Sequence, residues 1–331
     1  MGNGPNRDGC AVVSQAVAEP VFGTAPERAA PWLLVEHAGP WPWRAWPDDV
    51  PAEAAAVMDA AEAAGVRVNL VRRVRDRRRD AFTVIAVVPG GPMERRTVAD
   101  LRELSGLDVG ALAVGRSPGF GEVFDEQVVL VCTHGRRDVC CARYGRPVAV
   151  QLDRALPGRV WETTHVGGDR FAANVVTMPD GGYHGGVTVA EAEAVAAAIA
   201  EGRVVPSMWR GRAGLPQPVQ AAEYFLRQRF DIVAAEGLRW SQHHSAGEDG
   251  TVCAEFELDG AGRYRVTVRP RGSSEERLTS CAGPGVYGTP TTFDLVALER
   301  IDQSTRPAPR LAHHADLVDA AMLRIQRRSY G

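Results

Sequence analysis

The chain has 331 residues, of which 45% are hydrophobic and 24% are charged, a composition typical of a folded globular protein and not of a disordered or fibrous one. Its formal charge of -3 at pH 7 provides no basic field for nucleic acid or an anionic membrane. The sequence contains no apolar run of about 18 residues and no signal-peptide pattern. We therefore expect a cytoplasmic protein with no nucleic-acid or membrane partner.

The first third of the chain is predicted to form a small α/β layer. An apolar strand at 32–35 precedes an Ala-rich helix with proline at its start, and two strands and a short helix follow. These later elements are predicted at 51–64, 66–74, 82–88 and 98–104. The segment 72–79 contains six arginines, which we expect to form a solvated hairpin tip.

The middle of the chain has the predicted element order β-α-β-β-β-α. Its strands are expected at 127–131, 160–163, 171–178 and 183–187, and its helices at 147–156 and 189–201. The loop 133–141 lies between the first strand and the first helix. Apart from one short loop, this order is that of the thioredoxin fold core, in which the corresponding loop carries the reactive cysteines.

The last third is expected to be a linker followed by an α+β extension. A Pro/Gly-rich stretch precedes a helix, three strands and a final amphipathic helix, predicted at 209–218, 219–237, 251–258, 264–268, 293–298 and 311–327. We therefore predict an α/β protein with three parts. These are an N-terminal α/β domain at 1–120, a thioredoxin-like ferredoxin unit at 121–205, and a linker with a C-terminal α+β extension at 206–331.

Three of the six cysteines, Cys132, Cys140 and Cys141, fall within ten residues. Cytosolic thiols are mostly reduced, so this clustering favours metal ligands, catalytic groups or buried thiols over disulfides. His165 and Asp169 follow the next strand, whose end can face the same edge of the sheet. Thiolates with an imidazole suit zinc or an iron–sulfur centre. Zinc's usual CxxC knuckle is absent, and the eight residues between Cys132 and Cys141 are enough to span a two-iron cluster.

Two motifs make the pattern more specific: CTHGRRDVCCARYGRP, which begins at Cys132, and WETTHVGGDRFAANVVTMPDGGYHGG, which includes His165. They resemble the sucrase/ferredoxin-like family, and the similarity extends over most of residues 10–230. In that family a [2Fe-2S] cluster is held by a Cys-x8-Cys pair and a His-x3-His pair. The resemblance implies Cys132 and Cys141 as thiolate ligands and His165 as the first imidazole. It also implies electron transfer or redox sensing with a redox partner protein.

The sequence departs from the family pattern at the second histidine position, which is Asp169. Three hypotheses remain open: Asp169 binds iron through its carboxylate, Cys140 or another group supplies the fourth ligand, or the cluster has been lost. A carboxylate ligand makes the site more negative by one charge. We expect three arginines that flank the loops, Arg136, Arg137 and Arg170, to offset part of that charge.

Two alternatives belong to other classes, a thiol-based oxidoreductase and a structural zinc protein. The adjacent pair Cys140 and Cys141 is not the CxxC of dithiol oxidoreductases, which weakens the first. The remaining cysteines, Cys10, Cys253 and Cys281, are far apart in sequence and are expected to be buried or idle thiols.

Other polar and aromatic residues are expected to have structural roles. His134 is predicted to shape its loop, and Asp138 to pair with an arginine or cap the following helix. The tryptophans Trp41, Trp43 and Trp46 are interpreted as packing residues.

Overall fold

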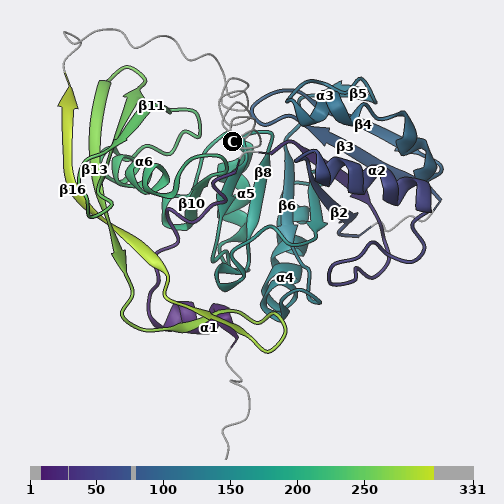
Figure 1. Ribbon diagram of the computed structural model, residues 1–331, viewed down its shortest axis with the longest axis horizontal. Coiled ribbons are helices and arrows are strands. Elements are labelled where there is room, and N and C mark those ends of the chain that lie inside the picture. Colours follow the sequence, from purple (N-terminus) through teal and green to yellow (C-terminus); the bar gives the residue numbers. More distant parts are fainter. Residues whose placement is uncertain (1–8, 29, 76–79, 302–331) are drawn as a thin grey trace, which may run out of the picture.

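The computed structural model describes residues 9–28, 30–75 and 80–301. Its centre is a ten-stranded mixed sheet with the order β10-β9-β8-β6-β7-β2-β1-β3-β4-β5 (Figure 1). Helices and strands alternate around this sheet, so the predicted α/β class is confirmed. The strands are β1 (Trp32–Glu36), β2 (Arg67–Arg73), β3 (Phe82–Val87), β4 (Met93–Val98), β5 (Glu122–Phe124), β6 (Val128–Cys132), β7 (Val160–Thr163), β8 (Val175–Met178), β9 (Gly182–His184) and β10 (Trp209–Arg212).

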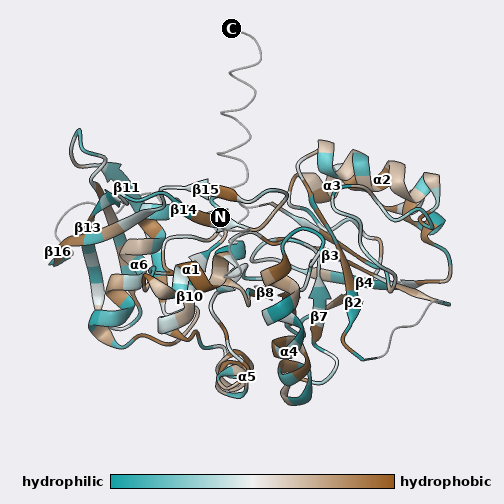
Figure 2. Ribbon diagram, turned by 90° about the horizontal axis from the view of Figure 1, so that it is seen from below, coloured by the Kyte–Doolittle hydropathy of each residue, from teal (hydrophilic) through white to brown (hydrophobic). Residues whose placement is uncertain are grey.

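Helices cover both faces of the sheet. Figure 2 shows α4 and α5 together on one side and α2 and α3 on the other. Apolar side chains of α4 and α5 pack against β6 through a core that includes Val129, Val148 and Val195. The helices are α1 (Cys10–Ala16), α2 (Ala52–Ala63), α3 (Val109–Ala113), α4 (Val139–Ala155), α5 (Ala192–Ala200) and α6 (Gln217–Phe230), with short 3-10 helices η1 (Leu101–Gly106), η2 (Asp169–Phe171) and η3 (Pro206–Met208).

The predicted β-α-β-β-β-α segment runs from β6 to α5. Strand β6 is parallel to β7 and antiparallel to β8, and β8 is antiparallel to β9. Because β6 and β7 are parallel, the residues that follow Cys132 and Thr163 emerge at the same edge of the sheet. That edge therefore carries both the loop that follows Cys132 and the loop that contains His165.

The helix after β6 begins earlier than predicted, at Val139 and not at residue 147. Asp138 caps it, because its Oδ1 accepts a hydrogen bond of 2.8 Å from the backbone N–H of Cys140. Capping and side-chain packing outweigh the helix-breaking tendency of Pro147, which lies inside the helix. Cys140 and Cys141 therefore lie in the first helical turn, and not in a loop as expected.

The arginine-rich segment also differs from its prediction. Residues 76–79 lie outside the described part of the chain, but Arg72 is buried in β2 and is not part of a solvated tip. Its guanidinium donates to Glu162 of β7 at 2.6 Å and stacks over the Trp41 ring at 4.1 Å. Thr133, in the loop after β6, donates to the same carboxylate at 2.8 Å. The N-terminal layer is thus joined to the loop that follows Cys132 through one buried carboxylate.

Strands β2 and β7 pair directly, so the sheet is continuous across the predicted boundary near residue 120. The division into three domains stays a prediction. Several elements had not been predicted from the sequence, namely α1, α3, β4, β5, β10, β11 (Leu238–Ser245), β14 (Arg277–Ser280) and β15 (Val286–Gly288). Residue 98 ends a strand and does not start a helix.

Beyond β10, α6 packs on a separate four-stranded sheet through apolar residues that include Leu226 and Phe256. A two-stranded arm, β14 and β15, extends away from this sheet and lies beside α1 (Figure 1). The strands are β11 (Leu238–Ser245), β12 (Val252–Leu258), β13 (Gly262–Gly272), β14 (Arg277–Ser280), β15 (Val286–Gly288) and β16 (Thr291–Ile301). The helix predicted at 311–327 lies outside the described residues. Within the described ranges, we find no helix with the length and apolar character needed to cross a membrane.

His184, at the end of β9, is a buried histidine with a pH-sensitive environment. Its Nε2 accepts a hydrogen bond from the backbone N–H of Val205 at 3.3 Å, and its ring meets Trp209 edge-on. Burial, and then the charge of Arg227, lower the pKa of His184 to about 4. The unfolded chain therefore binds a proton at His184 between about pH 6.5 and 4 that the folded chain does not.

We predict that His184 makes the fold less stable in mild acid. The contribution of His184 to the free energy of unfolding is complete above about pH 6.5. It falls by about 3 kcal/mol in total as the pH decreases toward 4. Urea unfolding of the wild type and of His184→Gln at a series of pH values between 7 and 4 measures this. The free energy of unfolding should fall by about 3 kcal/mol more in the wild type than in the variant; parallel curves would contradict the prediction.

Candidate metal centre

The structure brings together the four residues that the sequence singled out as ligands, Cys132, Cys141, His165 and Asp169, here called the quartet. Cys141 Sγ lies 3.4 Å from Asp169 Oδ1, and the same oxygen lies 3.0 Å from His165 Nδ1. Cys132 lies beside Cys141 and His165, close enough for both side chains to shift its pKa. Each residue comes from a different element: the end of β6, the first turn of α4, the loop after β7 and the start of η2.

The quartet is enclosed except at His165. Cys132, Cys141 and Asp169 are 1%, 0% and 6% exposed, whereas the His165 side chain is 29% exposed. His165 also lines a pocket of about 540 Å³, together with aromatic and polar residues that include Trp43 and Asn69. His165 is therefore the residue of the quartet that faces this pocket.

The four side chains shift one another's pKa values. The hydrogen bond from Cys141, helped by His165, lowers the pKa of Cys132 well below its usual value despite burial, whereas the pKa of Cys141 is raised by that same bond and by burial. Burial disfavours the imidazolium of His165, but Asp169 and Cys132 outweigh it and raise its pKa to about 9. Burial also opposes ionisation of Asp169, and the contacts with His165, Ser280 and Cys141 overcome it and lower its pKa.

The directions of these shifts favour the anionic forms of Cys132 and Asp169 and the protonated forms of Cys141 and His165. A metal binds the deprotonated forms of thiol and imidazole, so it would take the place of those two protons. His165 Nδ1 lies 3.0 Å from Asp169 Oδ1, so the imidazole and the carboxylate form an ion pair when His165 is protonated. Two thiols, an imidazole and a carboxylate are a donor set that fits a metal or an iron–sulfur group.

The arginines predicted to offset the charge of the site have other contacts. Arg136 is exposed, Arg137 lies over the Trp43 ring at 5.8 Å, and Arg170 pairs with the buried Glu19 at 2.7 Å. Their predicted role at the cofactor stays a prediction.

Arg210, which had no predicted role at the site, is fully buried beside the loop that carries Asp169. Its guanidinium donates to the backbone oxygen of Gly167 at 2.9 Å and to Asn174 Oδ1 at 2.7 Å. Burial lowers the pKa of Arg210 to about 10, and the charge of Asp169 is among the effects that oppose this. The sequence signal was its place within the stretch of residues 10–230 that resembles the family. No local pattern shows which loop an arginine on β10 will reach.

Cys140, an open candidate for the fourth ligand, lies with a different set of residues. Its sulfur is 3.8 Å from that of Cys281, and the two form a second group with Cys10 and Asp138. Two of the three cysteines expected to be buried or idle thiols, Cys10 and Cys281, therefore lie in one group, in which Cys10 is buried and Cys281 half-buried. Cys253 is buried in β12, outside this group. Asp138 caps α4, as predicted. His134 Nε2 donates to the backbone oxygen of Pro42 at 2.9 Å, which fits the predicted loop-shaping role.

A comparison with known protein families matches a long part of the chain. The model of the sucrase/ferredoxin-like family matches residues 22–211, which include all four side chains. A protein named "Altered inheritance of mitochondria protein 32" from Meyerozyma guilliermondii is 30% identical over 97 residues, covering 26% of this chain. The match spans about a third (34%) of the length of that relative. No solved structure matches the chain.

The loop between His165 and Asp169 contains two glycines that differ in the space around them. Gly167 and Gly168 both have positive φ, +95° and +79°, which disfavours any side chain. A Cβ on Gly167 would meet nothing within 4 Å, whereas one on Gly168 would overlap with the buried guanidinium of Arg210.

We predict that Gly168→Ala destabilises the protein more than Gly167→Ala. Both variants should lose about 1–2 kcal/mol from the backbone conformation, and Gly168→Ala a further 1–3 kcal/mol, roughly, from overpacking against Arg210. Urea unfolding of the metal-free proteins gives the difference. Equal losses would mean that Arg210 does not hold this loop in the way described.

Proposed function

The chain belongs to the sucrase/ferredoxin-like family, and we propose that it is an electron-transfer or redox-sensing protein that holds a [2Fe-2S] cluster on the quartet. The observation that carries the proposal is the convergence of two thiols, an imidazole and a carboxylate from four separate elements in a buried site. Thiolate and imidazole donors are those of iron–sulfur centres with mixed ligation.

The topology around the quartet supports a thioredoxin-like unit. The strand order is β7-β6-β8-β9, with β6 and β7 parallel and the other neighbours antiparallel. Helix α4 follows β6 and helix α5 follows β9, as in the thioredoxin core. Cys132 and Cys141 then occupy the end of the first strand and the start of the first helix of this unit.

Helix geometry supports Asp169 over Cys140 as the fourth ligand. Consecutive residues of an α-helix point about 100° apart, because a turn contains 3.6 residues. Cys141 Sγ faces Asp169, and Cys140 Sγ faces Cys281. The two adjacent thiols thus serve different sets of neighbours, and the carboxylate of Asp169 completes the quartet.

In this proposal the chain's own residues set the properties of the redox site. A [2Fe-2S] cluster accepts and returns one electron. Cys132 and Cys141 bring negative charge, His165 brings none when neutral, and Asp169 adds one charge that a second histidine would not add. Ser280 Oγ donates a hydrogen bond of 2.8 Å to Asp169 Oδ2, which partly offsets the negative charge of the carboxylate. The buried thiols exclude water, while His165 faces the pocket where a redox partner protein would dock.

Burial argues against thiol–disulfide exchange as the function. Attack on a disulfide requires an accessible sulfur, and the sulfur-bearing residues of the quartet are at most 1% exposed. The lowered pKa of Cys132 therefore favours a role as a metal ligand over a role as a nucleophile. A structural zinc ion on the quartet remains the other candidate, and metal analysis separates the two.

We predict that anaerobic reconstitution of the full chain with iron and sulfide produces visible iron–sulfur absorption and, after reduction, an electron paramagnetic resonance signal. About two irons and two sulfides per chain are expected. Cys132→Ser should abolish the signals. Cys253→Ser should retain them, because it removes a buried thiol that belongs neither to the quartet nor to the group around Cys140. A colourless, iron-free wild type, or one that binds only zinc at the quartet, would contradict the proposal.

We predict further that Asp169→His raises the reduction potential of the reconstituted protein. Replacing a carboxylate by a neutral imidazole removes one negative charge from the site, and imidazole ligation raises the potential of such centres, here by on the order of 100 mV. Protein-film voltammetry of the wild type and the variant measures the difference. Ser280→Ala is the companion variant: it removes a donor to the carboxylate and should lower the potential. An unchanged potential in Asp169→His would exclude Asp169 as a ligand.

A further inference from the structure

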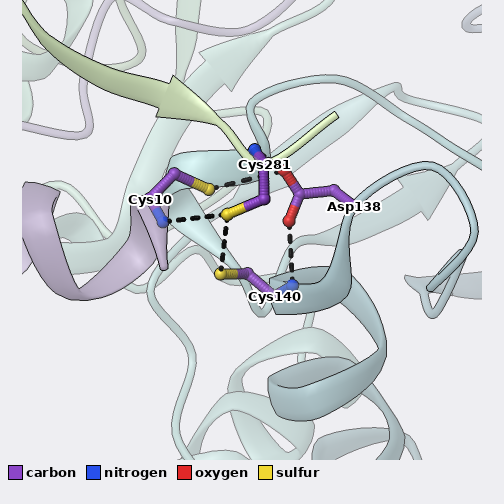
Figure 3. Close-up of side chains that lie close together, drawn as sticks. All are labelled: Cys10, Asp138, Cys140 and Cys281. Carbon is purple, nitrogen blue, oxygen red and sulfur yellow. Dashed lines mark hydrogen bonds between the residues drawn. The ribbon is translucent and has the colours of Figure 1, made fainter. Parts of the chain in front are cut away.

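The second group of thiols is assembled from three segments that are far apart in sequence. Cys10 lies in α1, Asp138 and Cys140 at the start of α4, and Cys281 directly after β14 (Figure 3). One possible ligand atom from each of the four residues lies within 4.8 Å of all the others. Cys10, Asp138 and Cys140 are buried, and Cys281 is half-buried. We call these four residues the thiol cluster.

We propose that the thiol cluster binds a single zinc ion, which fastens α1 and the β14–β15 arm to the start of α4. Three thiolates and one carboxylate form a four-donor set of the kind that structural zinc sites use.

The spacing of the donors suits one tetrahedral ion. With zinc–sulfur bonds of about 2.3 Å, two sulfurs on the same ion are about 3.8 Å apart, and a sulfur and a carboxylate oxygen are about 3.6 Å apart. The structure has 3.8 Å between the sulfurs of Cys140 and Cys281, and 3.5 Å between Cys10 Sγ and Asp138 Oδ2. A cluster of several irons would need wider spacing, because sulfides separate its metal atoms.

Backbone groups around the thiol cluster are placed to support anionic sulfur. The N–H of Cys10 donates to Cys281 Sγ at 3.2 Å. Such second contacts fix the orientation of ligands and offset their charge. Gly9 lets the backbone of α1 approach this closely, since a Cβ at that position would overlap with Cys140 Sγ.

Asp138 is equally well held. Its Oδ2 accepts from the backbone N–H of Cys281 at 2.6 Å, and its Oδ1 accepts from the N–H of Cys140 at 2.8 Å. Ser280 Oγ, whose single proton Asp138 shares with Asp169, lies 3.0 Å from Oδ2. The carboxylate is thus oriented from both α4 and the arm, and its Oδ2 points to Cys10.

The segments that supply the donors need such a fastening. Helix α1 has seven residues, too few to be stable on its own, and β14 and β15 form a two-stranded sheet, which is marginal by itself. Apart from the thiol cluster, these segments are joined by an apolar cluster that includes Ala11, Tyr144 and Leu278, and the buried carboxylate of Glu19, which follows α1, pairs with Arg277 of β14. Zinc at the thiol cluster would supply a further, stronger connection, because metal binding free energy adds to folding free energy.

Elemental analysis of the full-length wild type, expressed with zinc in the medium and purified without chelator, tests the proposal. We expect about one zinc per chain. Cys10→Ser and Cys281→Ser should each lower the zinc content at least tenfold, and the matched control Cys253→Ser should leave it unchanged. Cys132→Ser should also retain zinc, because it removes only a member of the quartet.

A second measurement needs no variant and so does not depend on how the variants fold. Co²⁺ added to the metal-free wild type should give the visible bands of a tetrahedral ion, with charge-transfer absorption that corresponds to three thiolates. Two thiolates would indicate the quartet instead.

Several outcomes would overturn the proposal: no zinc and no cobalt bands, a disulfide among Cys10, Cys140 and Cys281 in freshly purified protein, or zinc that is lost in Cys132→Ser and retained in Cys281→Ser. Two zinc ions per chain, one lost in each of these variants, would support zinc at the thiol cluster and contradict the iron–sulfur proposal for the quartet. The two proposals can therefore fail separately.

Discussion

The start of helix α4 is the constraint on which both groups of thiols depend. Asp138 caps the helix, and Gly145 allows it to pass directly over the end of β6, because any Cβ there would overlap with the carbonyl oxygen of Cys132. This close packing leaves Cys141 facing the quartet. One helical step earlier, Cys140 faces the opposite group, so a single capped turn fixes the direction of both sulfurs. A shift of the helix by one residue would leave one of the two sites with Val139 or Ala142 in place of its cysteine.

The part of the site that could be predicted from the sequence is the part that local chain geometry determines. Cys132 and His165 follow apolar strands that are recognisable in the sequence, and parallel strands bring their ends to one edge. The helix that carries Cys141 was predicted to begin too late, because Pro147 is a typical first residue of a helix and here lies inside one. The cap at Asp138 had been considered, but the strength of packing against β6 cannot be read from composition.

The thiol cluster was not predictable by the same reasoning. Cys10 and Cys281 are 271 residues apart, and they meet because the β14–β15 arm returns from the C-terminal sheet to the N-terminal helix. No periodicity or motif in either segment indicates that return. Arg210 and Arg72 illustrate the same limit, since each is an arginine in a polar-looking stretch that the fold buries against a specific partner. Long-range contacts of this kind depend on the order of strands in the sheet, which the sequence of each strand does not encode alone.

The two groups of thiols are also connected electrostatically. Ser280 Oγ lies 3.0 Å from Asp138 Oδ2 and 2.8 Å from Asp169 Oδ2, and its single proton can serve only one carboxylate at a time. The carboxylate with the greater negative charge attracts that proton more strongly. A cation at the thiol cluster would reduce the charge on Asp138 and leave the hydroxyl to Asp169, which lowers the negative charge felt at the quartet. An ion bound for structural reasons would then also help to set how readily the quartet accepts an electron, through one shared hydroxyl group and without any movement of the backbone.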